Sequence, residues 1–214
     1  MSYACKFKIE RTLFNAMVSA LPDSGEIRHY LHGIHFAHMR DSEGYEIYST
    51  DGRLLLISKV EVLDRIVLQS SGLIFDVGTK PLLKKFSHVV IEYDEALSGD
   101  KYQLYRVPSN SRLDVEQETR RLIDGKYPDV RRVVPVIDRE EKAYNAKTKK
   151  LAGRYVDWFA FQPHLIAAPA KYLGPVVEFS FSDGPLSAIS VRFPKHSDVT
   201  CVLMPCRNWR LWNL

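Results

Sequence analysis

Apolar and polar residues alternate along most of this chain, a pattern typical of β-strands that bury one face. Residues 3–9 place aromatic and aliphatic side chains on one side and two lysines on the other. In residues 11–21 the apolar residues recur every three or four positions, which predicts a helix that ends at the Pro-Asp-Ser-Gly sequence at 22–25. Three further strands are predicted, at residues 30–39, 45–49 and 53–61.

The same order of one strand, one helix and three strands then recurs. Residues 66–76 have the pattern of a strand, and residues 79–87 that of a short helix with Thr79 as its N-cap and Pro81 in its first turn. Strands are predicted at 88–93, 101–107 and 112–122. Two βαβββ units in succession predict one compact α+β domain over residues 1–135, in which the repeat is one of pattern and not of residue identity.

The rest of the chain, residues 136–214, predicts half of such a domain. Residues 137–153 are highly charged and poor in apolar residues, as in a linker, a solvated helix or a mobile loop. One more βαβββ pattern follows, with a helix over residues 162–173 despite Pro169. Its strands are predicted at 154–161, 176–182, 186–194 and 198–205. An aromatic tail, residues 208–214, ends the chain, and we expect it to dock on an apolar surface.

Composition indicates a globular protein with room for one large core or two small ones, since 45% of the 214 residues are hydrophobic and 26% are charged. The net charge of +4 permits contact with nucleic acid without requiring it. No apolar run has the length of a membrane span, and the N-terminus has no apolar signal core, so we expect a cytoplasmic protein without a membrane partner.

Residues with catalytic or metal-binding chemistry are few. The three cysteines include no closely spaced pair, and His32, His35 and His38 lie in a predicted strand, where they do not share one face. The chain has no glycine-rich phosphate loop, no metal-ligand cluster and no nucleophile–base pair. We therefore expect a binding protein that needs no cofactor or metal, with a nucleic-acid-processing enzyme as a less favoured alternative.

Three blocks of sequence stand out by the order of their residue types. The first is Arg28-His29-Tyr30-Leu31-His32-Gly33-Ile34, followed by Ser49-Thr50-Asp51-Gly52-Arg53-Leu54-Leu55. The second runs from Arg121 to Pro135 and joins two apolar segments through the Asp124-Gly125 turn and the Pro128-Asp129 corner. The third is Val202-Leu203-Met204-Pro205-Cys206-Arg207.

In this order and spacing, the three blocks resemble the bacterial DNA polymerase III beta subunit, the beta sliding clamp. The family has Arg-Tyr-Tyr-Leu-Asn-Gly and Ala-Thr-Asp-Gly-His-Arg-Leu in its middle domain, a Leu-Ile/Val-Asp-Gly-x-Phe-Pro-Asp-Tyr junction, and a terminal Val-x-Met-Pro-Met-Arg. The resemblance implies DNA-clamp domains of the processivity fold, one complete (1–135) and one partial (136–214). It also implies a DNA-replication accessory protein with double-stranded DNA, DNA polymerase or clamp loader as partners.

The resemblance further implies a cleft that holds clamp-binding peptides of these partners. The matching positions are Leu31, Thr50, Gly52, Leu55, Pro128, Arg132, Val133, Val202, Met204, Pro205, Cys206 and Arg207. Aliphatic and sulfur side chains suit an apolar pocket, and the two arginines suit the polar groups of a peptide. The alternative reading is that the aliphatic residues among them belong to the core.

DNA contacts in the family fall partly on the loop before the first block and partly on helices that face the duplex. The matching residues are Gly25, Arg28, His29, Tyr30, Lys84, Lys85 and Lys171. An arginine or lysine can pair with phosphate without reading bases, which suits a sliding protein. An ordinary exposed turn and solvated helix lysines are the alternatives.

Two departures from the family change the expectation. An arginine that lines the family's cleft is replaced by Leu54, and Arg53 lies one position away, which on a strand means the opposite face unless the chain bends there. The chain also has no equivalent of the family's first domain. It is therefore either a shortened clamp of a phage or mobile element that forms a homo-oligomer, or a truncated clamp that competes for polymerase or clamp-loader peptides without encircling DNA.

Overall fold

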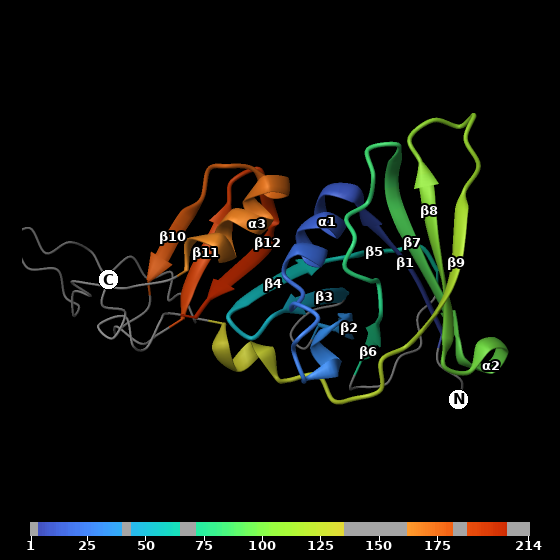
Figure 1. Ribbon diagram of the computed structural model, residues 1–214, viewed down its shortest axis with the longest axis horizontal. Coiled ribbons are helices and arrows are strands. Elements are labelled where there is room, and N and C mark those ends of the chain that lie inside the picture. Colours follow the sequence, from blue (N-terminus) through green and yellow to red (C-terminus); the bar gives the residue numbers. More distant parts are fainter. Residues whose placement is uncertain (1–3, 40–43, 65–71, 135–161, 182–187, 205–214) are drawn as a thin grey trace, which may run out of the picture.

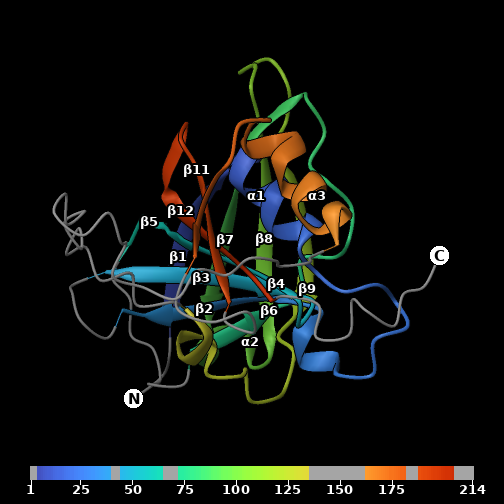
Figure 2. The same cartoon turned by 90° about the vertical axis from the view of Figure 1, so that its left-hand side faces the viewer.

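The computed structural model describes residues 4–39, 44–64, 72–134, 162–181 and 188–204, which form two β-sheets with two longer helices side by side and a short one apart from them (Figures 1 and 2). The strands are β1 Ala4–Glu10, β2 Ile34–His38, β3 Tyr45–Thr50, β4 Leu54–Lys59, β5 Glu61–Val62, β6 Leu73–Phe75, β7 Phe86–Asp94, β8 Lys101–Pro108, β9 Glu116–Arg121, β10 Glu178–Phe181, β11 Ile189–Phe193 and β12 His196–Leu203. The helices are α1 Arg11–Ser19, α2 Glu95–Ser98 and α3 Pro163–Leu173, with 3₁₀ turns η1 His29–Leu31 and η2 Val130–Val133.

The strand order shows that the two predicted units interlock. One sheet has the order β5-β1-β7-β8-β9 and the other the order β10-β11-β12-β4-β3-β2-β6. The first strand of each unit therefore lies against the other unit: β1 pairs with β7, and β6 pairs with β2, both antiparallel. This exchange confirms the α+β fold predicted for the first part of the chain, because neither unit completes its sheets alone.

The C-terminal strands extend the second sheet. Strand β12 pairs with β4 in the register Val202↔Leu55 and Leu203↔Leu54, so one sheet runs from β10 to β6. The predicted domain boundary at residue 135, the charged segment 137–153, the strand at 154–161 and the tail 208–214 lie outside the described residues.

An aromatic cluster joins the two sheets. The rings of Phe7 and Phe36 are stacked with centroids 4.1 Å apart, and Phe75 meets Phe7 edge-on at 5.5 Å. Tyr102 in turn meets Phe75 edge-on at 4.9 Å, and all four side chains are buried. Offset and edge-on aromatic pairs add to the gain from burying the rings, so this cluster is the centre of the main core.

Helix α1 closes the main core on one side and lies beside α3 (Figures 1 and 2). Its buried face carries Phe14, Met17 and Val18, three and four positions apart as the sequence predicts. The helix predicted at 162–173 is also present, and Pro169 lies buried inside it. Within the described ranges, no helix is both long and apolar enough to cross a membrane.

The helix predicted at residues 79–87 is wrong: this segment is irregular until β7 begins at Phe86. Two side chains of α1 hold it in place. Asn15 donates from Nδ2 to the Leu82 carbonyl (3.1 Å) and accepts from the Leu82 N–H (2.5 Å), and Arg11 donates to the Lys84 carbonyl (2.7 Å). The two bonds between Asn15 and Leu82 are buried, and a helix through Leu82 would have to give up the bond to its carbonyl.

Smaller differences concern where strands begin. The strand predicted from residue 30 begins at Ile34, because η1 precedes it, and the strand predicted from 112 begins at Glu116. The predicted strand 53–61 is divided into β4 and β5. Of the strand predicted at 66–76, only Leu73–Phe75 forms β6, and residues 66–71 lie outside the described ranges.

Candidate functional site

A second apolar cluster lies on the other face of the seven-stranded sheet. Leu54 and Leu56 of β4 point into the main core, whereas Leu55 and Ile57 belong to this outer cluster. Its other buried members are Leu31, Tyr48, Ile74, Tyr127 and Val202. The chain from Ile123 to Val134 lies over this face, so the second sequence block acts as its cover.

The turn between β3 and β4 is fixed by side-chain hydrogen bonds. Thr50 donates from Oγ1 to the Leu54 carbonyl (2.6 Å) and accepts from the Gly52 N–H (2.9 Å). Oδ1 of Asp51 accepts from the N–H groups of Arg53 and Leu54, both at 2.7 Å. Gly52 has φ +89°, and a Cβ there would lie 2.9 Å from the Arg28 guanidinium. The turn therefore requires glycine on both conformational and steric grounds.

A cleft of about 200 Å³ opens beside this turn, between η1, η2 and the end of β12. The structure brings together most of the predicted cleft residues at its wall: Leu31, Thr50, Gly52, Leu55, Pro128, Val133, Val202 and Met204. Five further residues line the cleft. Arg28 and Tyr30 were predicted to contact DNA, Arg53 and Leu54 are where the chain departs from the family, and no role was predicted for Val130. An aliphatic wall with a few polar groups at its edge is the usual composition of a ligand-binding pocket.

The remaining predicted cleft residues do not line the cleft or cannot be placed. Arg132 is 84% exposed at its side chain and donates from Nε to Oδ2 of Asp129 (3.2 Å). Pro205, Cys206 and Arg207 lie outside the described residues. Met204 is placed by the bond from its N–H to the Arg53 carbonyl (2.9 Å), which continues the β12–β4 pairing to the cleft.

The departure from the family at Arg53 and Leu54 has a structural explanation. Leu54 is 2% exposed and packs in the main core, so a core side chain stands here where the family has an arginine of the cleft. Arg53 lies in the bend before β4, lines the cleft, and donates from Nη1 to Oε1 of Gln162 (3.1 Å) in the residue before α3. The sequence predicts Arg53 in the cleft only if the chain bends before β4, and the chain does bend there.

A tight ion pair fixes the cationic edge of the cleft. Arg28 donates from Nε and Nη2 to the two carboxylate oxygens of Glu26 (2.8 and 2.7 Å), and its N–H donates to Oε1 (3.0 Å). These hydrogen bonds lower the pKa of Glu26 to about 2 and raise the pKa of Arg28. The guanidinium is thus held at the cleft by a carboxylate of the chain itself, which an anionic group of a ligand would have to displace.

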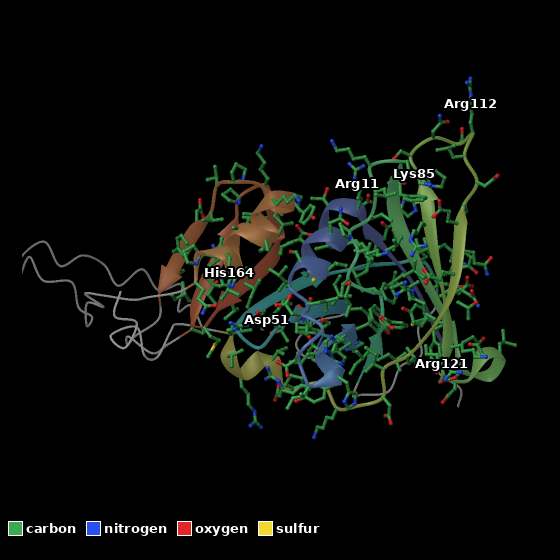
Figure 3. The ribbon with its side chains drawn as sticks, in the orientation of Figure 1. Arg11, Asp51, Lys85, Arg112, Arg121 and His164 are labelled. Atoms are coloured by element: carbon green, nitrogen blue, oxygen red, sulfur yellow. The ribbon has the colours of Figure 1, made fainter. Side chains whose placement is uncertain are left out.

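The residues predicted for DNA contact fall into two separate groups. Arg28 and Tyr30 line the cleft, Gly25 lines a neighbouring pocket, and Nε2 of His29 lies 3.0 Å from the Asp124 carbonyl. Lys84 and Lys85 are not on a helix, contrary to the prediction, because the segment before β7 is irregular. Lys85, beside Arg11 in Figure 3, is paired with Glu116 (2.6 Å).

Lys171 lies on α3 as predicted, with its Nζ 5.6 Å from the ring centre of Tyr172. Of the described histidines, His35 is buried and stacked on Tyr127 with ring centres 4.5 Å apart, and His32 lies 2.9 Å from the Glu26 carbonyl. No group of three His, Cys, Asp or Glu among the described residues is arranged to hold a metal ion.

Two interlocked four-stranded units, the first with a helix after its first strand, a sheet continued by further strands, and a cleft at that continuation together have the arrangement of a DNA sliding clamp. The structure is similar to the DNA polymerase III subunit beta of Bartonella birtlesii bound to griselimycin, at 21% identity and a TM-score of 0.60. It is also similar to the beta subunit of Caulobacter crescentus (18% identity, TM-score 0.59) and that of Thermotoga maritima (17%, 0.56).

These matches cover a larger share of this chain than of the clamp chains. The matches cover 94–95% of this chain but only 65–66% of the clamp chains, so this chain spans slightly less than two thirds of their length. No family model matches the sequence, and no curated protein matches it in sequence. The fold of a shortened sliding clamp is therefore evident from structure, at a level of identity that sequence comparison does not detect.

Proposed function

We propose that this protein is a sliding-clamp-like accessory protein of DNA replication whose cleft holds short apolar peptides of its partners. The supporting observation is the cleft itself, in which residues from four separate segments of the chain meet at one wall. They come from η1, the β3–β4 turn, η2 and the end of β12. A polymerase or a clamp loader with a matching peptide would be held by this wall while acting on DNA.

The chemistry of the wall defines the ligand. Leu55, Val202 and Met204 suit aliphatic or aromatic side chains. The cleft volume of about 200 Å³ has room for one or two such side chains and not for a folded domain. Arg53 at the edge suits a carboxylate beside the apolar residues, whereas Arg28 is already paired with Glu26. The fixed β3–β4 turn presents this surface with little rearrangement, which lowers the entropic cost of binding.

The test is a titration of a fluorescent clamp-binding peptide against the wild-type chain and two variants. Met204→Ala removes part of the cleft wall and should weaken binding about tenfold or more, which corresponds to ~1.4 kcal/mol or more. Leu83→Ala is the matched control, because Leu83 is 62% exposed and lies in the segment before β7, away from the cleft. Saturable binding that Met204→Ala leaves unchanged contradicts the proposal.

A second candidate is a truncated clamp that competes for such peptides without encircling DNA. The observation that favours it is the pairing of basic residues predicted to contact DNA: Arg28 with Glu26, and Lys85 with Glu116. A paired cation has less to gain from a phosphate, since it must give up its partner.

DNA binding measured against salt separates the two candidates. Each phosphate contact contributes about one unit to the slope of log affinity against log salt. A processivity factor should bind duplex DNA without sequence preference, and Lys171→Ala should flatten the slope by about one unit. A peptide competitor should show no measurable DNA affinity at moderate salt while keeping its peptide binding.

A further inference from the structure

The last residue that the structure describes is part of the cleft wall. Met204 lines the cleft, and its N–H is held by the Arg53 carbonyl (2.9 Å). The tail, residues 208–214, follows four positions further along the sequence. An extended chain covers at most about 3.3–3.6 Å per residue, so Trp209 can reach points within roughly 17 Å of Met204. The cleft, with a volume of about 200 Å³, is small enough to lie within that reach.

The composition of the tail suits the cleft wall. Its sequence is Asn-Trp-Arg-Leu-Trp-Asn-Leu, in which four of the seven residues are apolar and only Arg210 is charged. Successive side chains of an extended segment point to opposite sides, which groups Trp209 with Leu211 and separates both from Arg210. The aliphatic cleft has room for one or two side chains of this kind, as many as that side of the tail carries.

A second pocket, of about 340 Å³, adjoins the cleft, shares part of its wall and is lined by carboxylates. They belong to Asp23, Glu26 and Asp51, of which Asp51 is labelled in Figure 3. Glu26 is bound by Arg28, and Asp51 accepts hydrogen bonds from the backbone of its own turn. Asp23 is exposed and has no ion pair with any described residue. Asp23 is therefore the carboxylate of this pocket that can accept Arg210 of the tail.

We propose that the tail occupies the cleft of its own chain, with Trp209 and Leu211 against the aliphatic wall and Arg210 at Asp23. Apolar side chains that would otherwise face water gain a surface to cover, and an unpaired carboxylate gains a cation. This inference rests on the proposed function, because the tail then competes with partner peptides for the site that they bind. A partner peptide has to displace the tail, so the tail sets the affinity that a partner needs.

The covalent connection makes a weak contact effective. A segment joined to its site by a short linker has an effective concentration on the order of 1 mM. If the free tail binds with a Kd of about 0.1 mM, the connected tail fills the cleft about 90% of the time and weakens competing peptides about tenfold. A partner peptide with a low micromolar Kd still displaces the tail, so occupancy by the tail selects among peptides and does not close the site.

The first test compares the affinity of a fluorescent clamp-binding peptide for the full chain and for the chain without residues 208–214. Deletion should tighten binding about tenfold. Trp209→Ala in the full chain should give most of that gain, whereas Trp212→Ala, on the other side of the tail, is the matched control and should give little. Equal affinity for the full and the shortened chain overturns the proposal, and so does an equal gain from the two tryptophan variants.

The second test uses no partner peptide, so it separates this proposal from the proposed function. A labelled synthetic peptide with the sequence of residues 205–214 is titrated against the chain without residues 208–214. It should bind saturably, Met204→Ala should weaken binding several-fold, and Leu83→Ala, exposed and away from the cleft, should not. No saturable binding overturns the tail proposal, even if a clamp-binding peptide binds. Binding of the tail peptide without binding of a clamp-binding peptide supports the tail contact and contradicts the proposed function.

Two further measurements test the charge contact and the connectivity. Asp23→Asn should weaken binding of the tail peptide about twofold at low salt, whereas Asp114→Asn, at an exposed carboxylate between β8 and β9, should not. No effect of Asp23→Asn overturns the placement of Arg210. Sedimentation should give the full and the shortened chain the same oligomeric state, because the tail stays on its own chain. A loss of oligomers on deletion assigns the tail to the cleft of another copy and overturns the proposal.

Discussion

The two faces of the seven-stranded sheet are both apolar, but they are covered in different ways. On the inner face, Leu54 and Leu56 lie under the aromatic cluster and α1, in a core that both sheets share. On the outer face, Leu55 and Ile57 lie under one crossing segment, Ile123–Val134, which contains one 3₁₀ turn and no regular strand or helix of its own. One strand, β4, thus contributes alternate residues to a closed core and to a surface that is partly open.

The difference shows how a stable sheet can carry a binding site. The inner face provides the stability, because large side chains meet there from both sides. The outer face needs only a narrow cover, and where that cover ends the cleft begins. A site built on the second face of a rigid sheet is held in position by packing that the ligand never touches.

The largest expected effect is on the inner face. Phe36→Ala removes a fully buried ring that stacks on Phe7 at 4.1 Å and on Tyr45 at 5.3 Å. The free energy of unfolding should fall by about 3–5 kcal/mol, measured by urea denaturation. Phe36→Leu is the control and should lose less. A loss below about 1 kcal/mol for Phe36→Ala contradicts the view that this face provides the stability.

Adjacent residues of β4 allow a direct comparison of the two faces. Leu56→Ala should lower the free energy of unfolding by about 2–5 kcal/mol and leave peptide affinity unchanged. Leu55→Ala should cost less stability, because its cavity opens to the cleft and water can enter, but it should weaken peptide binding. Equal losses of stability with equal effects on binding mean that the two faces do not differ as described.

The cover of the inner face includes the irregular segment before β7, which Asn15 holds. Asn15→Ala leaves the buried N–H and C=O of Leu82 without their partner and should cost about 1–3 kcal/mol. Hydrogen exchange should show faster exchange at the Leu82 amide than in wild type. Ser19→Ala, which removes a bond within α1, is the control and should leave that amide protected.

The smallest effect concerns the edge of the outer face. The pKa of Glu26 lies at about 2 because Arg28 binds it, below the ordinary value of 4.5. A depressed folded-state pKa contributes stability above the unfolded value, and this contribution is lost as the pH falls from about 4.5 to about 2. In an NMR titration, Arg28→Ala should return the pKa of Glu26 toward 4.5. An unchanged value means that Arg28 is not the cause.

Local pattern predicts most of the strands and two of the helices, because alternation and helical spacing are set by the faces that each element buries. It failed at residues 79–87, where Thr79 and Pro81 are good helix starters. There the deciding contacts come from Arg11 and Asn15, which are far away in sequence. A tertiary contact of this kind leaves no trace in the local pattern.

The cleft was predicted by ordered motifs, and the structure adds what they left out. Arg28 and Tyr30 were predicted for DNA, and they line the cleft because η1 turns them toward the β3–β4 turn. Arg53 reaches the cleft only because the chain bends before β4. The roles of these residues in binding stay predictions until the titrations are done.

The exchange of first strands between the two units has a consequence for how the chain acquires its structure. Ala4 pairs with Asp94, so β1 cannot enter its sheet until β7 has been synthesised. During translation the apolar side of β1, with Phe7 and Ile9, stays unpaired with β7 while the intervening strands emerge from the ribosome. Pairings so distant in sequence slow folding and leave apolar surface exposed meanwhile. The interlocked architecture therefore leaves the apolar side of β1 without its β7 partner on the nascent chain until residue 94 has been added.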